Sequence, residues 1–233
     1  MTWNKIGLIG AMAEEIERIE ERLTNEKVID KAGIRFMEGT FCGKSVVLCR
    51  SGVGKVNAAV CTQLLIDQFG VDAIIFTGVA GALDPALDIG DIVISSDCMQ
   101  HDMDASALGF PRGTIPFADT SVFPADQALV KLAVQAGERQ ESGRIVCGRV
   151  LSGDQFIADR DTVKLLHEQL GGTCTEMEGS AVAQVCAMNG IPYVVIRSMS
   201  DKADGSAHVN FAEFTVKAAD RSYSIVERMV SSL

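Results

Sequence analysis

The sequence predicts one α/β domain built on a mixed β-sheet, and three observations support this prediction. Short apolar runs alternate along the chain with longer segments of helical periodicity. The expected strands are apolar at nearly every position, which is typical of strands buried on both faces by helices. No linker, internal repeat or low-complexity segment divides the 233 residues, so we expect a single domain over residues 1–233.

The N-terminal half begins with a brief strand and continues with two helices among further strands. The expected order is strand Ile6–Ile9, helix Glu14–Leu23, strands Arg35–Phe41 and Ser45–Arg50, helix Val56–Gln68, and strands Ala73–Thr77 and Asp91–Ser95. The strands are short apolar runs, whereas Ala, Leu and Ile recur on one face of the second helix.

The C-terminal half begins with residues 101–125, where several glycines accompany Pro111, Pro116 and Pro124. Such a composition predicts a long irregular segment. The expected elements after it are helix Ala125–Gly137, strand Arg144–Leu151, helices Asp161–Gln169 and Ser180–Asn189, strand Tyr193–Ser198 and helix Phe211–Val230.

Composition and charge exclude several classes of function. With 21 Lys and Arg against 31 Asp and Glu, the net charge of −10 opposes binding to nucleic acid or an anionic membrane. Seven dispersed cysteines and three histidines form no zinc motif, and free thiols fit a reducing compartment. The chain has neither a secretory signal nor an apolar run of 18 residues, so we expect a cytoplasmic protein.

Five segments at the ends of expected strands are candidates for a binding site, because ligands of α/β sheets collect there. They are Gly10–Glu15, Ser51–Lys55, Thr77–Ala82, Glu176–Ser180 and Arg197–Asp201. Each also has a structural explanation: a carboxylate favoured by a helix dipole, a tight turn, close packing of small residues, a helix cap or a turn cap. The second segment fits neither GxxxxGK[ST] nor GxGxxG, and His101, Asp102 and Asp104 do not complete a metal site.

Seven segments, in their order and spacing, resemble the bacterial 5′-methylthioadenosine/S-adenosylhomocysteine nucleosidases, a family within the family-1 nucleoside phosphorylase superfamily. They are IGLIGAMAEEI (6–16), SGVGKVNAA (51–59), TGVAGAL (77–83), GDIVIS (90–95), SGDQFI (152–157), EMEGSAVAQVC (176–186) and IRSMSDKAD (196–204). The resemblance implies a three-layer α/β/α fold with a twisted central sheet, a homodimer, and no cofactor or metal. It also implies hydrolysis of the N-glycosidic bond of methylthioadenosine and adenosylhomocysteine, with 5′-deoxyadenosine as a further substrate, in methionine salvage.

The same resemblance assigns roles by position in the matching segments. Glu15 corresponds to the base that activates water, and Asp201 to the acid that protonates N7 of adenine. Glu178 corresponds to the ligand of the ribose hydroxyls, and Phe156 to the residue that stacks on adenine. The full expected substrate-binding set is Ala11, Val53, Val79, Gly81, Phe156, Ile157, Glu176, Met177, Glu178, Ser200 and Phe211. A partner subunit is expected to supply Ala105, Leu108 and Pro116.

The chemistry of bond cleavage agrees with these assignments. The transition state carries positive charge on the sugar and negative charge on the leaving base, which carboxylates and a protonated acid respectively stabilise. Asp201 must therefore hold a proton while Glu15 stays ionised. An apolar mouth formed by Phe211, Leu108 and Pro116 would suit a thioether and leave a 5′-hydroxyl unsatisfied.

Three alternatives stay open beside this interpretation. A phosphate-dependent purine nucleoside phosphorylase would need cationic ligands that Phe76–Val79 and Gly10–Glu15 do not supply. A binding module without catalysis is opposed by the joint presence of three acidic residues at matching positions. An aminodeoxyfutalosine nucleosidase is the third alternative, because the sequence does not exclude that substrate. Val79 also stands where the family usually has serine, so we expect altered affinity with activity retained.

Overall fold

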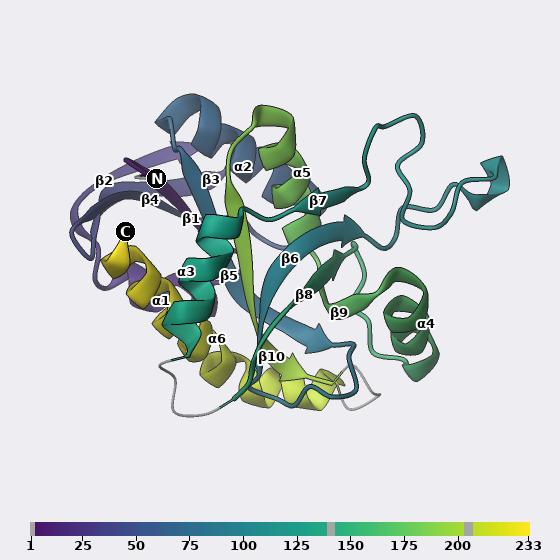
Figure 1. The fold of residues 1–233 in the computed structure, drawn as a ribbon. Coiled ribbons are helices and arrows are strands. Elements are labelled where there is room, and N and C mark those ends of the chain that lie inside the picture. Colours follow the sequence, from purple (N-terminus) through teal and green to yellow (C-terminus); the bar gives the residue numbers. More distant parts are fainter. Residues whose placement is uncertain (1–2, 139–142, 203–206) are drawn as a thin grey trace.

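Helices cover both faces of a ten-stranded mixed sheet in the computed structural model, which confirms the α/β prediction (Figure 1). The structure describes residues 3–138, 143–202 and 207–233, without the side chains of 207–213. The strands are β1 (Ile6–Gly10), β2 (Thr24–Lys31), β3 (Ile34–Phe41), β4 (Lys44–Arg50), β5 (Ala73–Ala82), β6 (Ile92–Gln100), β7 (Val122–Pro124), β8 (Ile145–Ser152), β9 (Gly172–Glu176) and β10 (Tyr193–Asp201).

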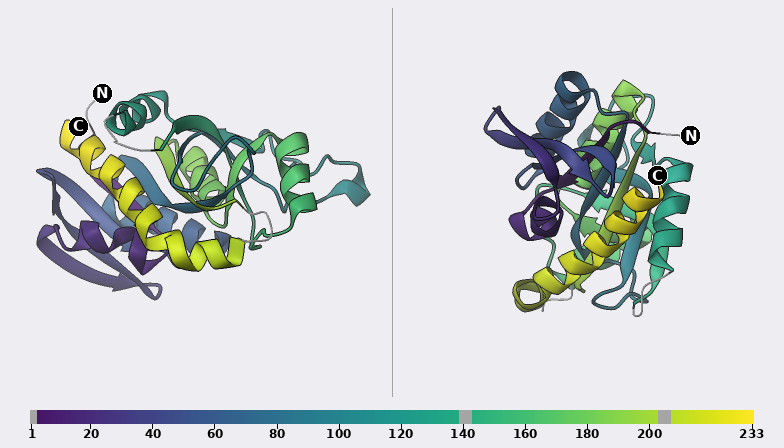
Figure 2. Two further views of the ribbon diagram at one scale, coloured as in Figure 1. Left: turned by 90° about the horizontal axis from the view of Figure 1, so that it is seen from below. Right: turned by 90° about the vertical axis from the view of Figure 1, so that its left-hand side faces the viewer.

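The helices form two layers on the sheet, as the views in Figure 2 show. They are α1 (Ala13–Glu20), α2 (Lys55–Phe69), α3 (Gln127–Gly137), α4 (Arg160–Leu170), α5 (Gly179–Asn189) and α6 (Ala207–Ser232). Helices α1 and α3 both pack on α6, whereas α2 and α5 pack on each other, and α4 contacts β9. Within the described part of the chain, no helix is long and apolar enough to cross a membrane.

The central strands are parallel, so their carboxyl ends reach the same edge of the sheet. Strand β5 lies between β1 and β10 and runs parallel to both. Strand β10 also pairs antiparallel with β6, and β9 pairs with both β8 and β5. The two short pairings of β9 bring Glu176 to the edge where Gly10 and Asp201 end their own strands.

The structure extends three predicted strands by three or more residues beyond their expected ends. Strand β5 continues through Thr77–Ala82, which the sequence analysis placed after the strand, and β6 continues to Gln100. Strand β10 continues to Asp201 through a bulge. The predicted strands ended where small and polar residues interrupt the apolar pattern, although hydrogen bonding between the strand backbones continues beyond that point. The predicted first helix ends at Glu20 instead of Leu23.

Three strands and one helical turn were not predicted. Strand β2 is exposed at nearly every position because it pairs with β3 alone, so it lacks an apolar pattern. Strand β9 has five residues and begins with Gly172, directly after α4. The irregular segment 101–125 contains one short helical turn at Ser106–Leu108 and strand β7, and otherwise agrees with the prediction.

Candidate active site

A cavity of about 300 Å³ opens at the edge where the carboxyl ends of β1, β5, β9 and β10 meet. Its lining is mostly apolar, with carboxylates at Glu15, Glu176, Glu178 and Asp201. The lining residues are Ala11, Met12, Glu15, Val53, Val79, Ala80, Gly81, Gln155, Phe156, Ile157, Thr175, Glu176, Met177, Glu178, Ser200 and Asp201. All five segments singled out from the sequence therefore contribute to one site.

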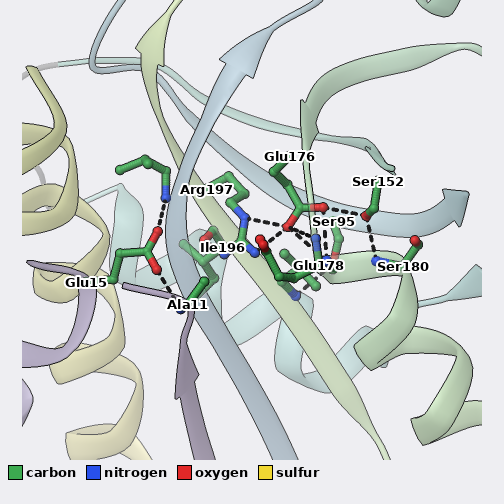
Figure 3. Close-up of polar contacts among 12 residues, drawn as sticks. Ala11, Glu15, Ser95, Ser152, Glu176, Glu178, Ser180, Ile196 and Arg197 are labelled. Carbon is green, nitrogen blue, oxygen red and sulfur yellow. Dashed lines mark hydrogen bonds and ion pairs between the residues drawn. The ribbon is translucent and has the colours of Figure 1, made fainter. Parts of the chain in front are cut away.

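Glu15 lies in the first turn of α1 and points back across the end of β1 (Figure 3). Its Oε2 accepts hydrogen bonds from the backbone N–H of Ala11 at 2.7 Å and of Met12 at 2.9 Å. Its Oε1 accepts from the backbone N–H of Val79 at 3.0 Å. Gly78 makes this approach possible, because a Cβ there would lie 2.4 Å from Oε1 of Glu15.

The protonation of Glu15 reflects opposing influences. Burial raises the pKa of Glu15 above its ordinary value, since a charged carboxylate loses solvation there. The guanidinium of Arg197 and the three backbone donors act in the opposite direction and offset part of the rise. A buried carboxylate whose pKa lies closer to neutrality is a better base than an exposed one.

Glu176, which lines the cavity, forms a buried ion pair with Arg197, which does not line it (Figure 3). Arg197 donates from Nη2 to Oε2 of Glu176 at 2.5 Å and lies over the ring of Phe76 at 3.9 Å from its centroid. Glu176 also accepts from the hydroxyl of Ser152 and from the backbone N–H of Gly179 at 2.8 Å. It therefore caps α5, the structural alternative that the sequence left open for one glutamate.

Glu178, at the start of α5, contacts the glycine-containing loop that follows β4. Its Oε1 accepts from the backbone N–H of Gly54 at 2.7 Å. Burial and the nearby Glu176 raise the pKa of Glu178 to about 8. The loop Ser51–Gly54 is thus a tight turn with Gly52 and Gly54 at positive φ. The backbone N–H of Gly54 already donates to the carboxylate of Glu178. This arrangement disfavours the phosphate-cradling alternative.

Asp201 ends β10 after the bulge and is buried, with 2% of its surface exposed. The hydroxyl of Ser200 donates to Oδ2 of Asp201 at 2.9 Å. Phe156 lines the same cavity and is half exposed, and Ile157 follows it in a buried position. An acid and an aromatic ring therefore border the same space.

Four predicted residues do not line this cavity or are not described. Ala105, Leu108 and Pro116 belong to the irregular segment and are absent from the cavity wall of their own chain. Phe211 lies in the first part of α6, outside the residues whose side chains are described. Around the described wall there is no Lys, Arg or His side chain, and the described residues contain no cluster suited to a metal ion.

Sequence reasoning missed several residues of the site. Met12, Ala80, Gln155 and Thr175 line the cavity without having been predicted. Arg197 was quoted within a matching segment but received no role, because a strand residue in an apolar run gave no sign of an ion pair. Glu176 and Arg197 meet only because their strands lie close together in the folded sheet, and no local sequence pattern predicts that arrangement.

Comparison with known proteins gives a consistent result. Residues 5–231 match the family model described as the phosphorylase superfamily. The chain belongs to this superfamily. A 5′-methylthioadenosine/S-adenosylhomocysteine nucleosidase of Staphylococcus carnosus is 43% identical over 232 residues, covering 98% of this chain and 100% of the relative.

Two solved structures of the superfamily are also similar. The nucleosidase of that name from Neisseria meningitidis, in complex with methylthio-immucillin-A, is 37% identical with a TM-score of 0.94 and covers 99% of this chain and 100% of its own. A futalosine hydrolase of Helicobacter pylori is 35% identical with a TM-score of 0.94, covering 99% of this chain and 98% of its own. The likeness confirms the nucleoside phosphorylase-like fold.

Val79 occupies a position where this superfamily member departs from the expected serine. Its side chain packs with Ala218, Ala219 and Met12, and 7% of it is exposed. We expect Val79→Ser to lower the free energy of unfolding by about 1–2 kcal/mol, because buried methyl groups are lost. Urea unfolding measures this loss. Turnover is expected to persist with a changed KM, since the backbone N–H to Glu15 is retained; abolished turnover would contradict this expectation.

Proposed function

We propose that this chain hydrolyses the N-glycosidic bond of 5′-methylthioadenosine and S-adenosylhomocysteine, and also of 5′-deoxyadenosine. The observation that carries the proposal is the placement of the buried carboxyl groups of Glu15 and Asp201 in one cavity, together with a wall that lacks cationic side chains among the described residues. The names and the bound analogue of the similar proteins support the same substrate class.

In this proposal the reaction begins at the leaving base. Asp201 delivers a proton to N7 of adenine, which neutralises the charge that develops as the bond between C1′ and N9 breaks. Phe156 stacks on adenine, the Ile157 backbone pairs with the base edge, and Ser200 orients Asp201 through its 2.9 Å hydrogen bond. No metal or cofactor is needed for this step.

The sugar side of the cavity completes the reaction. Glu178 binds the ribose hydroxyls with Met177 against the sugar, and the other lining residues predicted from the sequence, Ala11, Val53, Val79, Gly81 and Glu176, shape the pocket. Glu15 takes a proton from water as the oxygen attacks C1′. The three backbone donors fix the Glu15 carboxylate in place, so little reorganisation is needed in the transition state.

Hydrolysis and phosphorolysis differ in their need for an anion site. A phosphate dianion would require a charged partner, and Arg197 is already paired with Glu176 behind the wall. The test is adenine release from methylthioadenosine by the purified chain, with and without phosphate. Equal release in both conditions would support a hydrolase. Release that depends on phosphate would identify a phosphorylase, and no release would leave a binding module.

A second candidate substrate is aminodeoxyfutalosine, because a futalosine hydrolase is among the similar structures. The same cavity would bind its adenine and ribose, so the two substrates differ only in the 5′ substituent. Comparing kcat/KM for aminodeoxyfutalosine and methylthioadenosine in one preparation decides between them. A preference of more than about tenfold in either direction would assign the principal substrate.

The pH dependence of kcat/KM is expected to report the ionisation of Glu15. The base works when it is ionised, so activity should be lost as the pH falls through a pKa that burial has raised above the ordinary value of 4.5. Initial rates measured from pH 4 to 9 give the position of this acidic limb. In Glu178→Gln the rates should fall overall while the limb stays in place. A limb that moves with Glu178 would contradict the assignment.

We further propose that two copies of the chain form a homodimer in which Ala105, Leu108 and Pro116 of one copy border the cavity of the other. The irregular segment projects from the body of the molecule (Figure 2). Its side chains include Leu108, 71% exposed, and Phe117, 92% exposed, while Val56 on α2 is 74% exposed. These exposed apolar side chains support the proposal of an association surface.

Sedimentation of the native chain and of Leu108→Asp tests this association. We expect a dimer for the native chain and a shift toward monomer for the variant, because a charge in an apolar interface is costly. KM should rise in the variant if the partner completes the pocket. A native monomer at micromolar concentration would overturn the proposal. We also propose a cytoplasmic location, since all seven cysteines are free thiols.

A further inference from the structure

Lys55 joins three segments that are far apart in the sequence. Its backbone N–H, at the first residue of α2, donates to Oδ1 of Asp154 at 2.8 Å. Its ammonium group donates to Oδ1 of Asp102 at 2.6 Å and to Oε1 of Gln100 at 2.9 Å. The Lys55 and Asp102 side chains are 18% and 16% exposed, so solvent screens this ion pair only in part.

Asp102 also contacts the segment that contains Asp154. Its Oδ2 accepts from the backbone N–H of Asp154 at 2.9 Å, so its two oxygens bind different parts of the chain. Lys55, Asp102 and Asp154 therefore form a closed set of contacts, which we call the clasp. Its ionic character is consistent with the lowered pKa of Asp102, since the bonds from Lys55 and Asp154 outweigh the effect of burial.

His101 and Gly153, which neighbour the clasp residues Asp102 and Asp154 in the sequence, pack closely against each other. The ring of His101 is fully buried, and a Cβ on Gly153 would lie 2.5 Å from two of its atoms. The backbone N–H of His101 also donates to the carbonyl of Ser152 at 2.9 Å. The first residues of the loop after β8 therefore pack against the start of the irregular segment.

The clasp is adjacent in the sequence to two groups of residues that form the cavity. Asp154 immediately precedes Gln155, Phe156 and Ile157, which line the adenine side. Lys55 immediately follows Gly54, whose N–H binds Glu178 on the ribose side. The clasp therefore connects the loop expected to face the base with the loop expected to face the sugar.

We infer that Lys55 and Asp102 are positioning residues, which set the adenine-side loop against the ribose-side loop and so control substrate binding. This inference rests on the proposed function for the identity of the substrate. The two residues do not line the cavity, and they act through the loops that they connect. Misplacement of a positioned substrate by about 1 Å can cost up to roughly 10²-fold in rate.

The test combines kinetics with amide hydrogen exchange in Lys55→Met, Asp102→Asn and the double variant. Lys55→Met keeps the backbone bond to Asp154 and removes the ammonium. We expect faster exchange at residues 154–158, a rise of about tenfold or more in KM and in the adenine inhibition constant, and a smaller change in kcat. The loss in the double variant should be smaller than the sum of the two single losses, because both single variants remove the same ion pair.

A matched control is Lys5→Met, which removes the part-buried pair to Glu38 at 2.7 Å at the amino end of β1, away from the cavity. It should leave exchange at 154–158 and KM unchanged. Unchanged exchange in Lys55→Met would overturn the inference, and so would faster exchange with KM unaltered. Hydrogen exchange needs no substrate, so the clasp can be judged even if the chain releases no adenine; that result would instead count against the proposed function.

Discussion

Asp201→Asn is expected to lower kcat for adenine release from methylthioadenosine by about 10²–10⁴-fold, the usual contribution of a general acid. The amide has no carboxylic proton to give, so the leaving base would depart as an anion. Shape and volume are nearly unchanged, and Ser200 can still donate to the remaining carbonyl oxygen. KM is therefore expected to change much less than kcat, as for an interaction made in the transition state.

A substrate with a better leaving group separates acid catalysis from a structural effect. A 5-thioriboside of 4-nitrophenol needs no protonation to leave, so native chain and Asp201→Asn should cleave it at similar rates. Ser200→Ala is a milder companion, because it removes the hydrogen bond and leaves the acid in place. An equal loss on both substrates would show that Asp201 supports the site without protonating the base.

Most of the residues predicted for the site line one cavity, because they lie at or shortly after the ends of strands that local pattern identifies. Glu15 follows β1 by a few residues, and Glu178 opens a helix directly after β9, so their positions depend on chain segments that propensity and pattern describe. The family resemblance then assigned roles that periodicity could not. Where β5 continued past Thr77, the prediction ended the strand too early, since backbone pairing with β10 compensates for small side chains.

Contacts between distant segments were beyond prediction from one sequence. Arg197 and Glu176 meet because β10 and β9 both lie next to β5. The order of strands in the sheet sets this contact, and local sequence patterns do not predict that order. Gly78 illustrates the same limit, because small residues can admit a ligand or a side chain. Here the space is filled by the side chains of Glu15 and Arg197.

The buried pair leads to the second large effect. Arg197→Met is expected to lower the free energy of unfolding by about 3–5 kcal/mol, because it leaves the Glu176 carboxylate buried without its counter-charge. In the double variant Arg197→Met with Glu176→Gln, much of this loss should be recovered, since the neutral amide can still accept from the backbone N–H of Gly179. Chemical denaturation of the four proteins gives the coupling energy, and additive losses would contradict the pairing.

The same replacement is expected to alter catalysis through Glu15. Arg197 lowers the pKa of Glu15 against the larger effect of burial, so its removal should raise that pKa further. The acidic limb of kcat/KM should then move to higher pH in Arg197→Met, and the double variant should show the same displacement because Glu176→Gln does not restore the positive charge. A stability change with the limb left in place would mean that Arg197 serves the fold alone. A shifted limb would mean that one buried guanidinium both balances Glu176 and sets the basicity of the carboxylate that activates water.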